Sequence, residues 1–234
     1  MAKNFYKKLY YSIGLMSGTS MDQIDGIMCK TDGKNYFKLI EKTSLDYNSK
    51  TLLDLNHCIN DPKTSLHNKK IKNRLYKNVT EDHIKVIKKL IKKTGLYPDI
   101  IGFHGQTIYH DPKNKISIQV GMPELIKERF STNVVANFRN IDIENGGHGA
   151  PIAPIYHKFI IQKNKFNLPS CLINIGGISN LTYYDGDKLI GFDCGPGNVL
   201  LDSYCKIFIN IKYDSFGEIS QKGFKNDELV ECFF

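Results

Sequence analysis

Three short motifs place hydroxyl, carboxylate or imidazole groups beside glycines. The first, GLMSGTSMD at residues 14–22, follows an apolar run. Glycine lets a backbone approach a ligand closely, and consecutive N–H and hydroxyl groups at a tight turn can cradle phosphate oxygens. Asp22 and Asp25 are then available to hold Mg²⁺, directly or through water. The motif predicts a phosphate loop, although a plain hairpin turn uses the same residue types, so alone it leaves both interpretations open.

The second motif, GFHGQT at residues 102–107, follows a short apolar run. It places His104, Gln106 and Thr107 just after a predicted buried strand, where an α/β sheet presents groups that contact ligands. A structural histidine is the alternative interpretation. Three polar residues after an apolar run make a binding site about as probable as a structural role, so both interpretations stay open.

The third motif, GFDCGPGN at residues 191–198, places Asp193 at the end of an apolar run and before a glycine-rich turn. A partly desolvated aspartate at such a strand end can act as a general base. An aspartate that caps the following helix is the alternative, but Asn198 is itself a candidate N-cap. Cys194 has no histidine near it in the sequence, so we interpret it as a packing residue.

The elements that must position these motifs follow from hydrophobic spacing and turn residues. Strands at 10–16 and 24–30 form a hairpin around the first motif. A helix is expected from its N-cap Thr80 to Gly95, because apolar residues recur between them at helical spacing. Further helices are predicted at 50–60, 66–78 and 123–130, and further strands at 99–105, 116–121 and 133–138.

Glycines and a proline at 145–151 interrupt this pattern and predict a boundary between residues 1–144 and 145–234. Beyond it we expect a helix at 152–161 and two strands, CLINIGG and LTYYDG, joined by a glycine-bearing turn. A strand, a glycine-rich turn and a helix follow from Lys188. The alternation of strands and helices is typical of an α/β fold.

The composition excludes several classes of function. The chain has 234 residues, is 41% hydrophobic and has no apolar run near the ~18 residues that span a bilayer, so we expect a soluble, cytoplasmic protein without membrane contact. Its six cysteines form no C-x-x-C pair, which argues against a zinc site or disulfide framework, and no side chain is assigned as a metal ligand. Reduced, mostly buried thiols are expected.

The net charge of +8 raises the question of nucleic-acid binding. However, 29 of the 32 basic residues are lysines, and they are spread along the chain. Arginine is the residue that usually binds phosphates and base edges through two hydrogen bonds, and this chain has few arginines, so we expect no nucleic-acid partner. A basic module that binds an anionic polymer remains an alternative, and it would bind in a strongly salt-dependent way.

Five motifs in order, GLMSGTSMDQID, GFHGQTIYHDP, NGGHGAPIAP, INIGGISNLT and GFDCGPGN, give the chain a close resemblance to the anhydro-N-acetylmuramic acid kinase family. The resemblance implies a two-lobed actin-like ATPase (ribonuclease H-like) fold, with a first lobe at 1–144 and part of a second lobe at 145–234. It also implies a reaction in which ATP and water open the 1,6-anhydro ring and phosphorylate O6, giving N-acetylmuramic acid 6-phosphate.

The resemblance also implies roles for individual residues. Asp193 would take a proton from the water that attacks C1, while Mg²⁺ neutralises the charge developing on the phosphates. Arg139 could pair with the lactyl carboxylate of the sugar. A homodimer is the implied assembly. The ATP phosphate loop would comprise Gly18, Thr19, Ser20, Met21, Asp22, Gln23, Ile24 and Asp25, and the sugar side would comprise His104, Gln106, Arg139 and Asp142.

Three departures from the family pattern stand out. Gln23 replaces a glycine usual between the two aspartates, and Asn137 stands where aspartate usually precedes Phe-Arg. The sequence stops at KNDELVECFF, before the glycine-rich segment that helps to hold adenosine in the family. We therefore expect an incomplete second lobe, and an inactive remnant that retains at most ligand binding is the alternative function.

Overall fold

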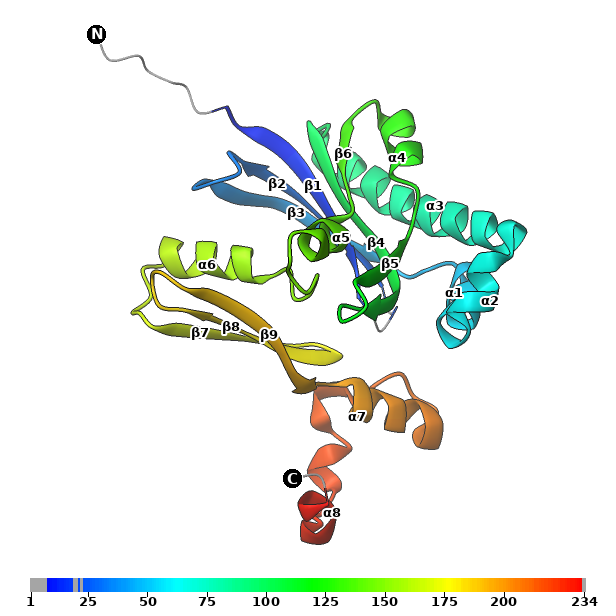
Figure 1. Ribbon diagram of the computed structural model, residues 1–234, viewed down its shortest axis with the longest axis vertical. Helices are drawn as coiled ribbons and strands as arrows, with labels where there is room; N and C mark the ends of the chain where they lie inside the picture. Colours follow the sequence, from blue (N-terminus) through cyan, green and yellow to red (C-terminus); the bar gives the residue numbers. More distant parts are fainter. Residues whose placement is uncertain (1–7, 19–20, 22, 233–234) are drawn as a thin grey trace. The chain divides into compact units, whose positions relative to one another are not determined.

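The computed structural model describes residues 8–18, 21 and 23–232 (Figure 1). The chain divides into two compact units. The first unit comprises residues 1–172 and 182–192, and the second comprises residues 173–181 and 193–234. The sequence-based boundary between residues 144 and 145 stays a prediction.

The first sheet has the strand order β3-β2-β1-β4-β5, with β6 also paired to β4. The pairs β1/β2, β2/β3 and β4/β5 are antiparallel, whereas β1/β4 and β4/β6 are parallel. A parallel strand can join a sheet only after a long crossover connection. Three helices form this connection before β4, between β3 and β4. The strands are β1 (Tyr10–Ser17), β2 (Ile24–Thr31), β3 (Phe37–Leu45), β4 (Ile100–Asp111), β5 (Ile116–Val120) and β6 (Asn133–Val135).

The core of the first unit lies between this sheet and the long helix α3, which runs along one face of the sheet (Figure 1). Helical spacing puts Leu75, Val79, Val86 and Leu90 on the buried side of α3. The helices of this unit are α1 (Ser49–Asn60), α2 (Pro62–His67), α3 (Lys69–Thr94), α4 (Pro123–Phe130), α5 (Phe138–Glu144) and α6 (Pro154–Lys163).

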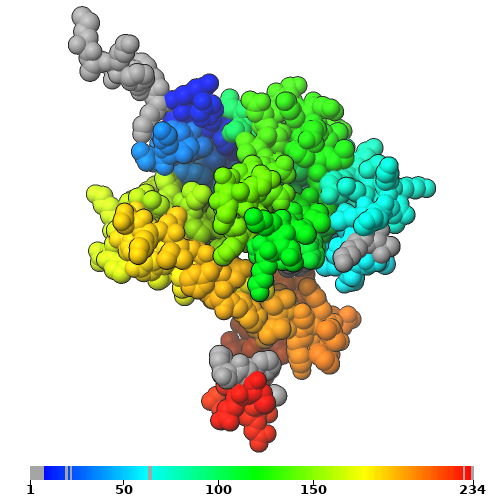
Figure 2. Space-filling view, in the orientation of Figure 1, coloured from blue at the N-terminus to red at the C-terminus, as the bar shows by residue number. Residues whose placement is uncertain are grey.

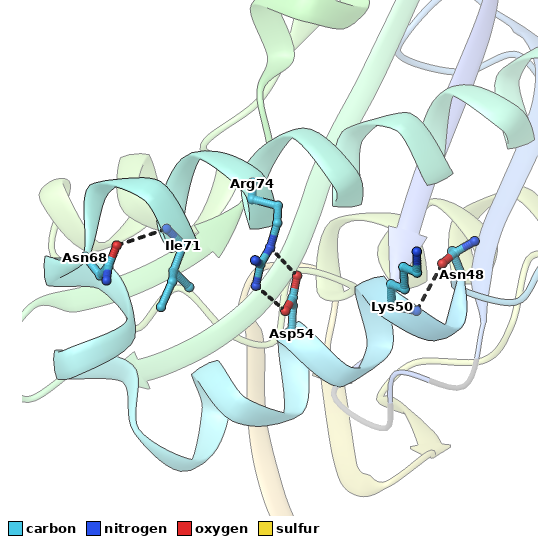
Figure 3. Close-up of polar contacts among 6 residues, drawn as sticks. All are labelled: Asn48, Lys50, Asp54, Asn68, Ile71 and Arg74. Carbon is cyan, nitrogen blue, oxygen red and sulfur yellow. Dashed lines mark hydrogen bonds and ion pairs between the residues drawn. The ribbon is translucent and has the colours of Figure 1, made fainter.

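Asparagine side chains begin both α1 and α3 (Figure 3). The Asn48 side chain accepts a hydrogen bond from the Lys50 N–H, and that of Asn68 accepts from the Ile71 N–H. Arg74 of α3 donates two hydrogen bonds, at 2.9 and 2.7 Å, to the Asp54 carboxylate of α1. These caps satisfy N–H groups that have no partner within the helix, and the ion pair joins α1 to α3.

The predicted helix start at Thr80 is wrong, because α3 runs unbroken from Lys69 and merges two predicted helices. The Thr80 hydroxyl instead donates to the Tyr76 carbonyl at 2.7 Å and accepts from the Met122 N–H at 2.8 Å. Gly95 ends the helix in the left-handed conformation, as predicted. Strand β3, with five polar residues in FKLIEKTSL, was not predicted at all.

A second, three-stranded sheet has the order β7-β8-β9. Its strands and the glycine-bearing turns beside them confirm the sequence-based expectation. The strands are β7 (Ser170–Ile175), β8 (Ile178–Tyr184) and β9 (Leu189–Pro196). After them come α7 (Val199–Tyr204), the π-helix η1 (Cys205–Ile209), the 3₁₀ turns η2 (Ser215–Gly217) and η3 (Ser220–Lys222), and α8 (Asp227–Glu231).

The helices and the cysteines can be compared with what the composition predicts. None of the helices described is long and apolar enough to cross a membrane; α3 has the length, but lysines recur along it. All six cysteines are free thiols. Cys29, Cys58 and Cys205 are buried, whereas Cys171, Cys194 and Cys232 are exposed, so the interpretation of Cys194 as a packing residue is wrong.

Candidate functional site

The first motif forms the connection between β1 and β2, as predicted. Ser17 pairs with Ile24 across the hairpin, and the Met21 N–H donates to the Gly18 carbonyl at 3.1 Å. Met21 has φ 54° and its side chain packs against the core. Three of the predicted phosphate-loop residues, Thr19, Ser20 and Asp22, lie outside the described residues.

The other predicted loop residues differ in environment. Gln23 is exposed, whereas Ile24 is fully buried and belongs to the core, so only the Ile24 backbone can face a ligand. Asp25 is the second residue of β2, and its side chain is largely exposed. Partial burial nevertheless raises the pKa of the Asp25 carboxyl above its ordinary value. A nearby cation would lower that pKa again, because it favours the charged form.

The second motif lies within β4, not after it, because β4 continues to Asp111. The expectation that this strand ends at residue 105 is therefore wrong. The parallel pairing with β1 shifts from Leu15–Phe103 to Ser17–Gln106, which leaves one extra residue on β4. Gly105 allows this bulge with φ 70°, and a Cβ there would lie 2.6 Å from the Val120 carbonyl oxygen. The bulge re-aims the side chains that follow it.

Gln106 is fully buried, and its amide is completely engaged by the protein. Its Nε2 donates to the carbonyls of Gly18 and Thr107, each at 3.1 Å. Its Oε1 accepts from the Tyr47 hydroxyl, also at 3.1 Å. Sequence reasoning missed Tyr47, because its partner lies 59 residues away and nothing near Tyr47 in the sequence signals the contact.

The structure brings together two residues predicted for the sugar side, His104 of β4 and Arg139 of α5. The Arg139 Nε–H donates to His104 Nε2 at 2.8 Å. The His104 Nδ1–H donates to the Gly105 carbonyl, also at 2.8 Å, so these partners assign a neutral ring. Burial, and then the charge of Arg139, lower the pKa of His104 to about 4. The Gly105 carbonyl also accepts from the Ser17 hydroxyl at 3.1 Å.

Asp142, also predicted for the sugar side, holds the glycine-rich turn after α5. Its carboxylate accepts the Gly149 N–H at 2.7 Å, while the side chain remains exposed. Asn137, which precedes α5, has φ 60° and ψ 29°. Asparagine adopts this left-handed conformation more readily than most residues, so the departure from the family pattern at this position suits the local backbone.

In the second unit, Asp193 is an exposed residue of β9. The glycine turn after it packs against the turn between β7 and β8. Gly177 O accepts from the N–H groups of Gly197, at 2.8 Å, and Val199, at 3.2 Å, and Gly176 O accepts from the Asn198 N–H at 2.7 Å. A Cβ at position 197 would lie 2.2 Å from the Gly176 oxygen, so glycine is required there.

These features define a mixed α/β protein with a buried, hydrogen-bonded histidine in its first unit and an exposed aspartate on a strand in its second. Comparison with known families identifies it further. A family model described as anhydro-N-acetylmuramic acid kinase matches residues 10–233, so the chain belongs to that family.

Individual relatives carry the same name. The chain is 42% identical over 230 residues to the anhydro-N-acetylmuramic acid kinase of Pelagibacter ubique, covering 96% of this chain and 61% of the relative. It is 37% identical to that of Hydrogenovibrio crunogenus, covering 95% and 59%, and 33% identical to that of Rhodospirillum rubrum, covering 91% and 56%. The chain thus spans about three fifths of the length of these curated relatives.

Among solved structures, an exopolyphosphatase-like protein is similar over 85% of this chain and 54% of its own, with a TM-score of 0.45 and 9% identity.

Proposed function

We propose that this chain carries the activity for which its family is named, an ATP-dependent kinase reaction that opens 1,6-anhydro-N-acetylmuramic acid and phosphorylates O6. The observation that supports this most is the family match over residues 10–233, which includes all three chemistry-bearing motifs. Such a reaction would place the protein in the recycling of cell-wall amino sugars, in the cytoplasm. The family resemblance is also the ground for proposing a homodimer.

We further propose that residues 1–144 form the first lobe of a two-lobed, actin-like fold of ribonuclease H type. The first sheet supports this. An antiparallel meander of β3, β2 and β1 is extended by β4 and β6, both parallel to β1 in direction, with α3 packed on the sheet. The remaining residues would belong to the second lobe.

In this proposal the β1–β2 turn holds the phosphates of ATP, through backbone N–H groups that follow Ser17. Asp25 fits the role of a Mg²⁺ ligand, because its carboxylate is largely exposed and lies close to the turn in the sequence. Mg²⁺ typically uses one or two carboxylates together with substrate phosphates. When bound, it would neutralise charge on the transferring phosphoryl group.

Asp193 is the proposed general base. It takes a proton from water while the water oxygen forms a bond to C1 of the sugar. The bond between C1 and the anhydro oxygen breaks, which leaves that oxygen on C6. The oxygen attacks the γ-phosphorus of ATP, and ADP leaves. The backbone hydrogen bonds from Gly197 and Asn198 to the β7–β8 turn would fix the end of β9 that carries this aspartate.

On the sugar side, neutral His104 would orient Arg139 through the hydrogen bond from Nε–H, and Arg139 is the residue proposed to pair with the lactyl carboxylate. Asp142 would position the turn that contains Gly149. Gln106 would act through Gly18, because both ends of its amide are already bonded to the protein.

ADP release by the purified chain, with and without 1,6-anhydro-N-acetylmuramic acid, tests this proposal. We expect sugar-dependent ADP that falls at least about a hundredfold in Asp193→Asn. The matched control is Asp187→Asn, which removes the same charge from an exposed turn between β8 and β9 and should leave the rate unchanged. Sugar-dependent ADP release that survives Asp193→Asn would refute the assignment of the base.

A ligand-binding protein without catalysis is the second candidate function. It is favoured by the many exposed apolar side chains of the second unit, such as Phe208 and Phe224, which are 71% and 99% exposed. Absence of ADP from a folded chain that still binds ATP or the sugar would support it over the kinase.

A further inference from the structure

The carbonyl of Gly18, at the start of the predicted phosphate loop, accepts a hydrogen bond from the Gln106 side chain, which in turn accepts one from Tyr47. We propose that Tyr47 and Gln106, here called the Gly18 clamp, are positioning residues that fix the direction of the Gly18 carbonyl, where the predicted phosphate loop begins. The inference rests on the proposed function for the loop's ligand, but the clamp itself rests on the contacts below.

The Gly18 carbonyl oxygen accepts two hydrogen bonds from different directions along the chain. Gln106 Nε2 donates to it at 3.1 Å, and so does the Met21 N–H, at 3.1 Å. Two donors on one carbonyl restrict rotation of its peptide plane. The Met21 side chain also packs against the core, and its backbone has φ 54°, so Gly18 and Met21 are each held by contacts of their own.

Tyr47 bonds the other end of the Gln106 amide. Nε2 donates to the carbonyls of Gly18 and Thr107, and Oε1 accepts from the Tyr47 hydroxyl. A flipped amide would set its oxygen against the two carbonyl oxygens, so these oxygens determine the orientation of the amide. The Tyr47 hydroxyl donates to Oε1 in that orientation and so stabilises the arrangement in which Gln106 holds Gly18.

Burial makes these contacts hard for water to replace. Gln106 has no exposed surface and Tyr47 is 6% exposed. The pKa of Tyr47 lies well above its ordinary value, chiefly because of burial, so the hydroxyl keeps its proton and remains a donor at neutral pH. Removing it leaves Gln106 Oε1 as a buried acceptor without this donor, which costs more than a solvent-exposed hydrogen bond.

The chain provides a matched control in Tyr184. This tyrosine is 4% exposed, its hydroxyl donates to the Gly186 carbonyl at 2.9 Å and accepts from Gln162 Nε2 at 3.1 Å. Tyr184→Phe thus removes a buried hydroxyl that is bonded to a glutamine and to a glycine carbonyl. Tyr47→Phe removes a buried hydroxyl that is bonded to a glutamine, and that glutamine bonds a glycine carbonyl.

The experiment compares Tyr47→Phe and Tyr184→Phe with the unchanged chain by two readouts. The first is hydrogen exchange of the Met21 amide, followed by NMR without ligand. The second is the affinity for Mg-ADP, measured by calorimetry. We expect Met21 exchange to accelerate about fivefold to tenfold in Tyr47→Phe, with Mg-ADP affinity weakened by a similar factor. Tyr184→Phe should change neither, even if it lowers the melting temperature by the same amount.

A second variant protects the test against a failure of Tyr47→Phe to fold. Gln106→Met keeps the volume and removes both ends of the amide, so it should accelerate Met21 exchange alone. The double variant Tyr47→Phe, Gln106→Met should be no worse than Gln106→Met, since both substitutions break the same chain of contacts.

The outcomes separate the clamp from the proposed function. Unchanged Met21 exchange in both single variants, or equal acceleration in Tyr184→Phe, would overturn the clamp. Failure of the unchanged chain to bind Mg-ADP would count against the proposed function, and the exchange data would still decide whether Tyr47 and Gln106 fix Gly18.

Discussion

The two compact units of this chain are each stabilised internally by a different kind of interaction. In the first unit, apolar side chains of the sheet and of α3, among them Ile13, Leu75 and Ile101, are almost completely buried. Among the described residues of the second unit, Cys205 is the buried apolar side chain, while Phe208, in a segment coloured orange at the surface in Figure 2, is 71% exposed. The second unit depends on backbone hydrogen bonds between glycine turns.

The difference bears on how each unit positions its candidate site residues. In the first unit, Gln106 and His104 are themselves buried and bonded, so their geometry depends on the core around them. In the second unit, Asp193 is exposed, and the local backbone fixes the end of its strand. Changes that weaken the core should therefore disturb the first group of residues and spare the second.

Acid should produce the largest effect, and it should be confined to the first unit. Burial lowers the pKa values of His83 and His104 to about 4, below the value near 6.5 in an unfolded chain. Below pH 6.5 the unfolded chain binds these protons and the folded chain does not, so stability present above pH 6.5 is lost as the pH falls towards 4. The free energy of unfolding should decrease by about 1.4 kcal/mol per pH unit for each histidine, or about 4 kcal/mol in all at pH 5.

Urea titrations between pH 7 and 5, followed by circular dichroism because the chain has no tryptophan, measure this. His83→Leu removes one titrating ring and should halve the slope. An unchanged slope in that variant would show that the acid sensitivity arises elsewhere.

A core deletion should have the next largest effect. Ile101→Ala empties a fully buried position of β4 and should lower the free energy of unfolding by about 3 kcal/mol, from lost transfer energy and the cavity left behind. Phe208→Ala, at an exposed position of η1, should change it by less than about 0.5 kcal/mol. Equal costs in urea unfolding would abolish the contrast between the two units.

A glycine contact should be the sensitive point of the second unit. In Gly197→Ala, the new methyl group would meet the Gly176 oxygen at 2.2 Å, so the turns must separate at a cost of about 2 kcal/mol. Faster hydrogen exchange at the amides of Asn198 and Val199 would report it. Gly177→Ala is the control, because a Cβ there meets nothing within 4 Å. Similar exchange in both variants would show that the glycine contact does not hold the unit together.

Local patterns predicted much of the fold. The β1–β2 hairpin, the end of α3 at Gly95, and the strand-turn-helix around Asp193 each depend on residues close in sequence. Strand β3 was missed because FKLIEKTSL mixes charged and apolar residues on half-buried positions and so lacks clean alternation. Thr80 is a residue type common at N-caps, but it lies inside α3, where its hydroxyl accepts a hydrogen bond from the distant Met122 N–H.

For the candidate site, the sequence predicted residues that the structure brings together, such as His104 and Arg139. It did not predict the hydrogen bond between them. It placed Gln106 beyond a strand end because a bulge at Gly105 has no signature in hydrophobic spacing. It missed Tyr47, since long-range hydrogen bonds between buried polar groups leave no periodic trace. Roles for the remaining predicted residues stay predictions.

The shared carbonyl of Gly105 limits how this site can be redesigned. One oxygen accepts from Ser17, which leads into the proposed phosphate loop, and from His104, which bonds Arg139. If the proposed roles hold, a substitution intended to change sugar preference through His104 would also alter the support of the proposed nucleotide side. Directed evolution toward a new sugar should therefore recover compensating changes around Ser17, and libraries that vary one side while fixing the other would be poor in active members.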